Sequence, residues 1–223
     1  MRKRFITDRI SYIPASTDPL SADVGMIEGE EFLYLFDVGA KEDVAEFLNM
    51  LPKPKKLILS HFHPDHMKNI ERMNYVEGYV GANTAKYLKN YINLEESESD
   101  TEELLLQEHG WRIVDAPITI SDGVELTVFP MPSSHAKGSL AATVGGTHTF
   151  LGDAAYCTGK KGRAVYNAQL LKEQIEVLKT LRSNYLLLSH AEPFVKEREQ
   201  VIKQLEDIYS RRKKGEPYIE AEE

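Results

Sequence analysis

One segment constrains what this chain can fold into more than any other. The apolar run 57–59 leads directly into the pattern His61-x-His63-x-Asp65-His66. A short apolar run between turn signals is typical of a buried strand. Residues two apart on a strand project to the same side, so His61 and His63 can face one centre. Asp65 and His66 follow on the next turn and can reach a second point.

Imidazole and carboxylate side chains together are typical ligands of zinc, and also of iron or manganese. Four such residues are too few for two ions, so a two-metal hypothesis requires more of them downstream. Three further candidates each follow a predicted strand, namely His135, Asp153 and His190. Gly152 precedes the aspartate and permits close approach of the backbone there. The pattern favours a metal centre over a polar turn that holds its histidines by chance.

Strands and helices alternate in both halves of the chain, and each half begins with a β-rich segment. Strands are predicted at 5–14, 24–28, 32–37, 57–59, 78–81, 111–114, 118–120, 125–131, 141–145, 149–151 and 185–188. Helices are predicted at 42–50, 84–92, 169–181 and 195–214. A layered α/β protein with two sheets and outer helices accounts for this order. We expect one domain over residues 1–215, followed by a frayed tail at 216–223.

Charge and composition exclude several classes of protein. The 223 residues include 27 Lys and Arg against 35 Asp and Glu, which gives a net charge of −8. Binding to duplex nucleic acid requires a net cationic field, so no nucleic-acid partner is expected. The longest apolar run, Phe32–Phe36, is far too short to cross a membrane. Cys157 is the only cysteine, and no signal peptide is evident, so we expect a cytoplasmic, soluble protein whose oligomeric state stays open.

These motifs, in this order from Phe36-Asp37-Val38-Gly39 to His190, resemble the metallo-β-lactamase fold hydrolase superfamily. The resemblance implies a four-layer αββα sandwich with a site for two divalent metal ions between the sheets. Zinc is the preferred ion, with iron or manganese as alternatives. The implied roles are His61, His63 and His135 on the first metal, Asp65, His66 and His190 on the second, Asp153 as the bridge, and Asp37 behind a ligand histidine.

The chemistry that the resemblance implies is hydrolysis by a metal-bound hydroxide. Bound metal ions lower the pKa of water toward about 7 and polarise a carbonyl or phosphoryl oxygen. Asp65 would orient the nucleophile and pass its proton to the leaving group. Tyr156, in the segment Asp153-Ala154-Ala155-Tyr156, matches a tyrosine of the acyl-homoserine lactonases and is a candidate oxyanion donor. The equal alternative is an aromatic ring packed beneath the active-site loop.

We expect a small-molecule substrate, an ester, thioester or lactone, as in the glyoxalase II and lactonase branch. Secreted β-lactamases lack the bridging aspartate, and flavodiiron proteins carry a carboxylate in place of the second histidine. Met67-Lys68-Asn69 stands where the family often has small residues, which alters the pocket wall. A phosphodiesterase or nuclease on the same site and a non-catalytic metal-binding scaffold remain alternatives.

The sequence leaves the roles of two further segments undecided. The segment Lys160–Arg163, expected to be a loop, would either attract an anionic substrate tail or simply be solvated. The stretch Asn93–Gly110 includes a run rich in carboxylates and is a candidate lid over the pocket.

Overall fold

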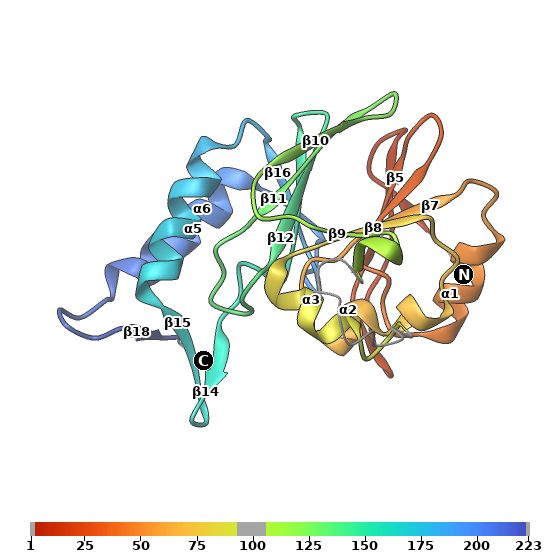
Figure 1. Ribbon diagram of the computed structural model, residues 1–223. Coiled ribbons are helices and arrows are strands. Elements are labelled where there is room, and N and C mark those ends of the chain that lie inside the picture. Colours follow the sequence, from red (N-terminus) through yellow and green to blue (C-terminus); the bar gives the residue numbers. More distant parts are fainter. Residues whose placement is uncertain (1–2, 93–105, 222–223) are drawn as a thin grey trace.

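The computed structural model describes residues 3–92 and 106–221 (Figure 1). In these ranges two mixed β-sheets face each other, and helices cover the outer face of each sheet. The predicted αββα sandwich in a single domain is thus confirmed. No helix within the described ranges has the length and apolar character of a membrane span. Most of the candidate lid, residues 93–105, lies outside the described residues.

The first sheet has the strand order β1-β2-β5-β6-β7-β8-β9 among the described residues. Its strands are β1 (Arg4–Phe5), β2 (Ile10–Ile13), β5 (Val24–Glu28), β6 (Leu33–Phe36), β7 (Lys55–Ile58), β8 (Glu77–Val80) and β9 (Trp111–Ile113). Pairing is antiparallel from β1 to β6 and parallel from β6 to β9. Parallel neighbours require crossover connections. These contain α1 (Glu42–Met50), α2 (Pro64–Met67), the 3-10 helix η1 (Lys68–Arg72) and α3 (Ala82–Leu88).

The second sheet has the strand order β10-β11-β12-β13-β16-β17 in the part of the chain that the structure describes. Its strands are β10 (Ile118–Ser121), β11 (Glu125–Pro130), β12 (Leu140–Val144), β13 (His148–Gly152), β16 (Tyr185–Leu188) and β17 (Val195–Glu197). Helix α5 (Ala168–Thr180) lies in the crossover from β13 to its parallel neighbour β16. Helix α6 (Arg198–Ser210) follows β17, and both helices pack on the outer face of this sheet (Figure 1).

Alternate residues of a strand face opposite layers, so one short strand serves two cores. In β6, Leu35 lies in the core beneath α1 and α3, whereas Phe36 lies in the core between the sheets. In β16, Leu188 packs toward α5 and α6, whereas Leu187 faces the opposite sheet. Phe36 stacks on Phe150 of β13 with ring centroids 5.2 Å apart, which joins the two sheets at the centre of the sandwich. The alternation of side chains along each strand therefore lets one sheet pack on its outer helices and on the other sheet at the same time.

Several predicted elements are confirmed to the residue, and others need correction. The strand at 24–28, the helix at 42–50 and the strand at 185–188 match β5, α1 and β16. The single strand predicted at 5–14 is wrong, because β1 and β2 form an antiparallel hairpin instead. The Thr7 hydroxyl accepts hydrogen bonds from the backbone amides of Arg9 and Ile10, which stabilises the turn between them.

The helix predicted at 195–214 begins later than expected. Val195 pairs with Leu187 in β16, so the first residues extend the second sheet as β17 and the helix starts at Arg198. An apolar residue beside an exposed strand edge can pack its side chain and also pair the free backbone N–H and C=O groups of that strand. The spacing of apolar residues that predicts the helix does not show that its first residues pair with a neighbouring strand.

A small third sheet overturns two expectations about the polar segments. Strands β14 (Thr158–Lys160) and β15 (Arg163–Asn167) form a hairpin where a loop was predicted at 160–163, and β18 (Tyr218–Glu220) pairs with β15. Lys161 and Gly162 both have positive φ, which suits a two-residue hairpin turn. The frayed tail predicted at 216–223 is therefore wrong for β18, where Ile219 is only 3% exposed. A further hairpin joins β3 (Ser16–Thr17) and β4 (Leu20–Ser21).

Candidate metal centre

The seven predicted ligand residues come from five places in the chain, and the fold brings them together. All of them lie at or just beyond strand ends on the same edge of the sandwich. His61 and His63 follow β7, Asp65 and His66 lie in α2, His135 follows β11, Asp153 follows β13, and His190 follows β16. In the described residues, every one of these side chains belongs to a group whose ligand atoms lie within 4.8 Å of one another.

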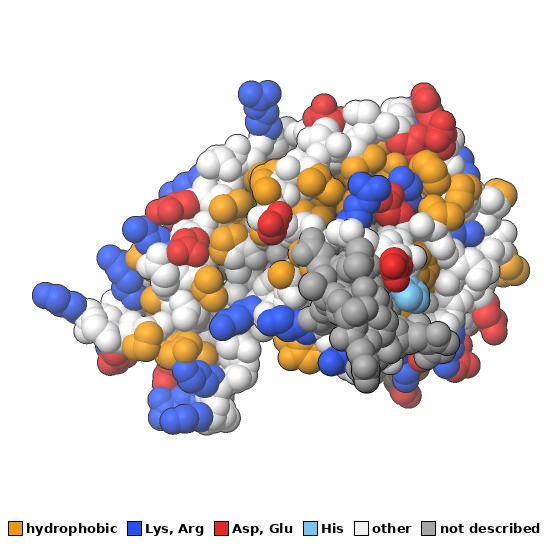
Figure 2. Space-filling view, in the orientation of Figure 1, with side chains coloured by type: hydrophobic (Ala, Val, Ile, Leu, Met, Phe, Trp, Pro, Cys, Tyr) orange, Lys and Arg blue, Asp and Glu red, His pale blue; other side chains and the backbone are white. Residues whose placement is uncertain are grey.

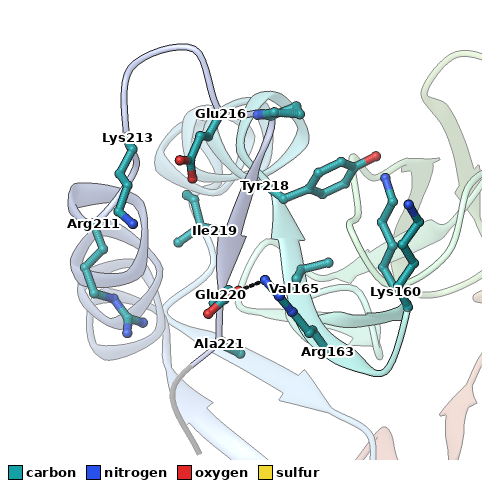
Figure 3. Close-up of a pocket in the computed structure, with 12 residues that line it drawn as sticks. Lys160, Arg163, Val165, Arg211, Lys213, Glu216, Tyr218, Ile219, Glu220 and Ala221 are labelled. Atoms are coloured by element: carbon teal, nitrogen blue, oxygen red, sulfur yellow. Dashed lines mark hydrogen bonds and ion pairs between the residues drawn. The ribbon is translucent and has the colours of Figure 1, made fainter.

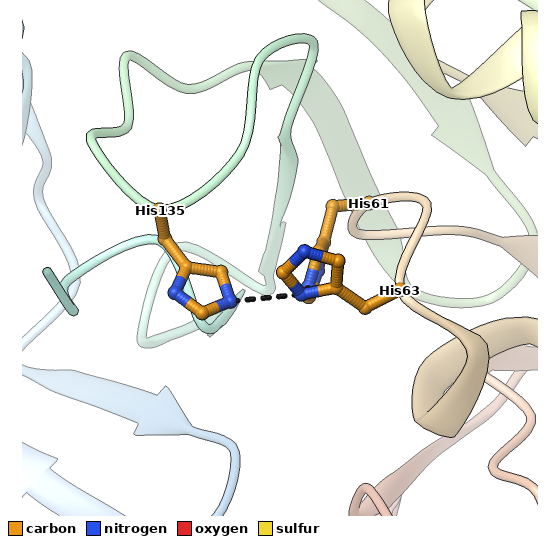
Figure 4. Close-up of side chains that lie close together, drawn as sticks. All are labelled: His61, His63 and His135. Carbon is orange, nitrogen blue, oxygen red and sulfur yellow. Dashed lines mark hydrogen bonds between the residues drawn. The ribbon is translucent and has the colours of Figure 1, made fainter. Parts of the chain in front are cut away.

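His61, His63 and His135 form the first group (Figure 4). The Nδ1 atom of His63 lies 2.9 Å from His61 Nε2 and 3.0 Å from His135 Nε2. A tetrahedral zinc ion with Zn–N bonds of about 2.1 Å holds its ligand atoms about 3.4 Å apart. The observed separations lie within a few tenths of an ångström of that value, so the three nitrogens suit a common ion.

Hydrogen bonds at the opposite ring nitrogens establish which tautomer two of these histidines adopt. His135 Nδ1 lies 2.9 Å from the Cys157 carbonyl oxygen, which can only accept, so Nδ1 carries the proton. His61 Nδ1 lies 2.9 Å from the Ser60 hydroxyl oxygen, and that hydroxyl in turn donates to Asp37 Oδ2 at 2.7 Å. Both rings therefore direct an Nε2 lone pair at His63, whose Nδ1 can donate to only one of them. A cation at this point satisfies every nitrogen.

Asp65, His66 and His190 form the second group. Asp65 Oδ2 lies 3.0 Å from His190 Nε2 and 3.5 Å from His66 Nε2. His66 Nδ1 donates to Asp37 Oδ2 at 2.8 Å, which leaves Nε2 facing the group. A buried carboxylate thus supports the ring from behind, the arrangement that fixes the tautomer of a metal-binding histidine.

Asp153 lies between the two groups. Its Oδ2 atom is 3.3 Å from His66 Nε2, 3.4 Å from His135 Nε2 and 3.9 Å from His190 Nε2. One carboxylate oxygen therefore approaches histidines of both groups. This placement is what a bridging ligand requires.

Unsatisfied buried atoms show that the cluster suits a cation. His66 Nε2 and Asp153 Oδ1 are both buried and have no hydrogen-bond partner among the described residues. Buried polar atoms are normally paired, so two orphaned ligand atoms at one point require an explanation. A metal ion between them would satisfy both, and the donor set of imidazole and carboxylate suits zinc, iron or manganese.

The electrostatics of the cluster keep His61 and His63 neutral. Burial, reinforced by the neighbouring imidazoles of His66 and His63, strongly lowers the pKa of His61. Burial and the nearby His135 also lower the pKa of His63. Neutral imidazole is the form that binds a metal, so these rings need not lose a proton first.

The second group behaves differently because it lies among carboxylates. Burial opposes protonation of His66, but the Asp37 and Asp153 carboxylates outweigh it and raise the pKa to about 10. Burial likewise opposes ionisation of Asp65, but its hydrogen bond to His190 prevails and lowers the pKa of the carboxyl. The same hydrogen bond raises the pKa of His190. These carboxylates attract positive charge, which a divalent ion would supply in place of the proton on His66.

The backbone is strained at two residues of the centre. Asp37 and His190 have φ values of 62° and 60°, although neither is glycine. Such conformations persist where surrounding contacts impose them, and they gather at functional sites. Asp37 also accepts a hydrogen bond from the Ser60 backbone amide at 2.7 Å. Gly152 has φ +55°, and a Cβ atom there would lie 2.7 Å from the Ser60 side chain, which confirms the predicted close approach.

Three supporting residues were not predicted from the sequence. Asp23 accepts a hydrogen bond from the His190 backbone amide at 2.9 Å and another from the Ala15 amide at 3.0 Å. Ser189 accepts one from the Asp23 amide, and Ser60 links Asp37 to His61. An aspartate beside the apolar strand 24–28 was the available signal for Asp23, but its partner lies 167 residues away.

Tyr156 lies at the edge of the centre with its hydroxyl engaged. The hydroxyl donates to the Ser189 carbonyl oxygen at 2.7 Å, and the ring centroid lies 6.5 Å from that of His135. Burial, aided by the Asp153 and Asp23 carboxylates, raises the pKa of Tyr156, so the hydroxyl stays protonated and able to donate. In this structure the side chain ties the loop after β13 to the loop after β16.

Solved structures with the same fold extend over nearly the whole chain. A metallo-beta-lactamase superfamily protein from the archaeon Sulfolobus tokodaii has a TM-score of 0.60 at 17% identity, over 92% of this chain and 88% of that chain. A B3 metallo-beta-lactamase with an active-site glutamic acid has a TM-score of 0.68 at 11% identity, over 95% and 90%. A mutant flavo di-iron protein from Thermotoga maritima has a TM-score of 0.64 at 12% identity, over 96% and 63%. These identities show a common fold and leave the activity open.

Comparison with curated proteins finds no match. A family model described as "Beta-lactamase superfamily domain" matches residues 34–214, which include all the predicted metal ligands. The match spans most of the chain and agrees with the two-sheet architecture and the buried histidine and aspartate cluster. The chain therefore belongs to the metallo-beta-lactamase superfamily.

Proposed function

We propose that this protein is a hydrolase that uses two divalent metal ions to cleave a small-molecule ester, thioester or lactone. One observation carries the proposal: seven ligand-type side chains converge on two adjacent points, with Asp153 between them. His66 Nε2 makes no hydrogen bond among the described residues, yet it faces two carboxylate oxygens, Asp153 Oδ2 at 3.3 Å and Asp65 Oδ2 at 3.5 Å, as a ligand nitrogen beside a shared ion would. Superfamily membership supports hydrolysis as the reaction class.

Each residue of the centre has a distinct task in this proposal. His61, His63 and His135 would hold one ion, Asp65, His66 and His190 the other, and Asp153 both. When bound, two such ions supply Lewis acidity, which activates water at neutral pH and polarises the scissile oxygen. Zinc is the ion we expect, with iron or manganese as alternatives.

Asp65 is the residue we assign to proton movement. Its side chain is 15% exposed, and its Oδ2 atom lies within hydrogen-bond distance of His190 Nε2, at 3.0 Å. A carboxylate so placed can accept a proton from attacking water and return it to the leaving group. Asp37 would position His66 through the 2.8 Å hydrogen bond to its Nδ1.

Tyr156 has two roles that this structure can support. Its hydroxyl remains a donor, and rotation away from Ser189 would direct it toward an oxyanion. Its present hydrogen bond favours the alternative role, in which the ring and hydroxyl fix the loop that carries His190. The variant Tyr156→Phe distinguishes them: loss of an oxyanion donor lowers kcat about 100-fold, whereas loss of a loop contact lowers thermal stability instead.

Metal content measured together with turnover tests the proposal. Protein purified without chelator or histidine tag should contain about two metal equivalents per chain by plasma mass spectrometry. It should hydrolyse members of an ester, thioester and lactone panel faster than bis-p-nitrophenyl phosphate. Asp65→Asn should lose at least about 100-fold in rate, whereas Asp207→Asn on α6 makes the same change away from the centre and should keep full activity.

Other outcomes would select the alternatives. Faster cleavage of the phosphodiester would indicate a phosphodiesterase or nuclease. Two bound metal ions without turnover on any panel would indicate a binding scaffold. Absence of metal after reconstitution with zinc, manganese and iron would refute the metal centre altogether.

A further inference from the structure

The small sheet formed by β14, β15 and β18 borders a groove that the proposed chemistry does not use. The groove has a volume of about 950 Å³ and lies between this sheet and the residues that follow α6 (Figure 3). We call it the basic groove, because five cationic residues line it: Lys160, Lys161, Arg163, Arg211 and Lys213. Two carboxylates, Glu216 and Glu220, also line it.

This concentration of positive charge contrasts with the rest of the molecule. The whole chain carries a net charge of −8, yet among the described residues that line the groove cations outnumber carboxylates five to two. Figure 2 shows Lys and Arg side chains gathered at the end of the molecule where β14 and β15 lie in Figure 1. Glu220 pairs with Arg163 at 2.6 Å, so these two charges offset each other and the sum over the other lining residues stays positive. The remaining charge is available to attract an anion from solvent.

The cationic side chains lie on both sides of β18. Figure 3 shows Arg211 and Lys213 on one side of β18 and Lys160 on the other. Lys160 Nζ lies 3.4 Å above the Tyr218 ring, which places a cation over an aromatic face. The ring thus helps to hold the Lys160 ammonium in place, where it can meet an anionic group.

The basic groove adjoins the metal centre through the backbone. Strand β14 begins one residue after Cys157, whose carbonyl oxygen lies 2.9 Å from His135 Nδ1. At about 3.3 Å per residue, Lys160 lies roughly 10 Å along the strand from that carbonyl. From the other side, the Asn167 backbone amide of β15 donates to Ser134 Oγ at 3.0 Å, one residue before His135.

A further cation acts on Tyr218 from the chain segment that carries His135. Lys137 follows His135 by two residues, and its charge acts on Tyr218 together with that of Lys160. The hydrogen bond from Lys160 and the positive charges of Lys160 and Lys137 lower the pKa of the Tyr218 hydroxyl. The hydrogen bond from the Asn167 amide to Ser134 Oγ thus ties the loop that carries His135 to β15, a strand that borders the basic groove.

We propose that the basic groove binds a phosphate-bearing part of the substrate, so that the hydrolase acts on a thioester or ester attached to a phosphorylated, nucleotide-like carrier. This inference rests on the proposed function for its catalytic half, since the groove alone only binds. Lysine and arginine side chains form charge-assisted hydrogen bonds to phosphate oxygens. The groove volume suits a nucleotide-sized group, because ligand sites range from about 300 to 1,000 Å³.

Binding of ADP against adenosine tests the groove without requiring turnover. The two probes differ only in their phosphates, and titration calorimetry of the purified protein at low salt measures both. We expect ADP to bind at least about tenfold more tightly than adenosine, and less tightly as salt is added. The groove variant carries Lys160→Gln, Lys161→Gln and Lys213→Gln together, and it should lose at least about tenfold in ADP affinity.

A matched control removes the same charge elsewhere. The control variant carries Lys172→Gln, Lys196→Gln and Lys203→Gln, which lie outside the groove on α5, β17 and α6. It should bind ADP within about twofold of the unmodified protein, and thermal melts should show both variants folded. Equal binding of ADP and adenosine, unchanged binding by the groove variant, or equal losses in both variants would each overturn the proposal.

Catalysis provides the second arm of the test. Acetyl-coenzyme A and the acetyl thioester of N-acetylcysteamine share the scissile bond, but only the first carries phosphates. We expect a lower KM for the phosphorylated thioester, and a smaller KM difference between the two in the groove variant. If neither thioester is cleaved, the thioester proposal fails while the ADP titration still decides whether the groove binds phosphate. Binding of a 12-nucleotide single strand more than about tenfold tighter than ADP would overturn the small-molecule assignment in favour of a nucleic-acid strand.

Discussion

The metal centre and the basic groove are two polar regions built by opposite means. In the metal centre the side chains are short, three of the seven proposed ligands (His61, His66 and Asp153) are buried, and His66 is supported from behind by Asp37. In the basic groove the side chains are long and exposed, and their main constraint is the strand from which they project. The two regions differ because a buried polar side chain needs a hydrogen-bond or ion-pair partner for each polar atom, whereas water can solvate an exposed cation. Changes in the two regions should therefore differ greatly in cost.

Removal of the central carboxylate should have the largest effect. Asp153→Ala deletes the oxygen that approaches histidines of both groups, so we expect metal content to fall from about two equivalents to one or fewer. Activity should fall at least about 1,000-fold, because both ions take part in the proposed reaction. Plasma mass spectrometry and turnover measure the two effects. The control variant His109→Ala alters a histidine outside the cluster and should leave metal content and turnover unchanged. Full activity in Asp153→Ala would refute the role of Asp153 as a bridging ligand.

A pair of glycine substitutions compares the two regions directly. Gly152→Ala places a Cβ atom 2.7 Å from Ser60 at a positive φ, so we expect a loss of about 2 kcal/mol or more in unfolding free energy. Gly159→Ala in β14 meets no atom within 4 Å and should change stability by less than about 0.5 kcal/mol. Urea denaturation of both variants measures the difference. Similar losses would show that the centre is no more tightly packed than the small sheet.

Loss of the supporting charge should have a moderate effect. Asp37→Asn keeps a polar side chain but weakens the hydrogen bond to His66 Nδ1, so metal affinity should fall about 10- to 100-fold. Competition with a chromophoric chelator measures that affinity. The matched variant Asp43→Asn changes an exposed carboxylate in α1 and should keep the original affinity. If the two variants bind metal equally well, Asp37 does not position the histidine.

The smallest effect should come from the surface of the small sheet. Arg163 and Glu220 form an ion pair with side chains 72% and 65% exposed. Exposed pairs contribute little because water screens them, so Arg163→Gln should lower stability by less than about 0.5 kcal/mol. A thermal melt in low and high salt measures it. A loss above about 1 kcal/mol would show that this pair secures β18 to β15.

The sequence predicted elements well where the local pattern and the tertiary environment agree. Helix α1 and strands β5 and β16 were located to the residue, because each has an apolar face and clear boundaries. It failed for β14, β15 and β18, which are short, polar and largely exposed. Strand β18 forms only by pairing with β15 about 50 residues earlier, as Ile219 does with Tyr166, and no local pattern encodes a distant partner.

For the site, the sequence determined the ligand types and their positions at strand ends, because strand period and residue chemistry are both local properties. Only the tertiary structure decided which nitrogen of each ring faces the centre, since that depends on partners such as the Cys157 carbonyl and Asp37. It also decided that Asp23 supports His190 and that Lys160 and Lys213 share one groove. Hydrogen bonds and charge clusters of this kind join segments far apart in the chain, and their geometry exists only once the sheets have packed.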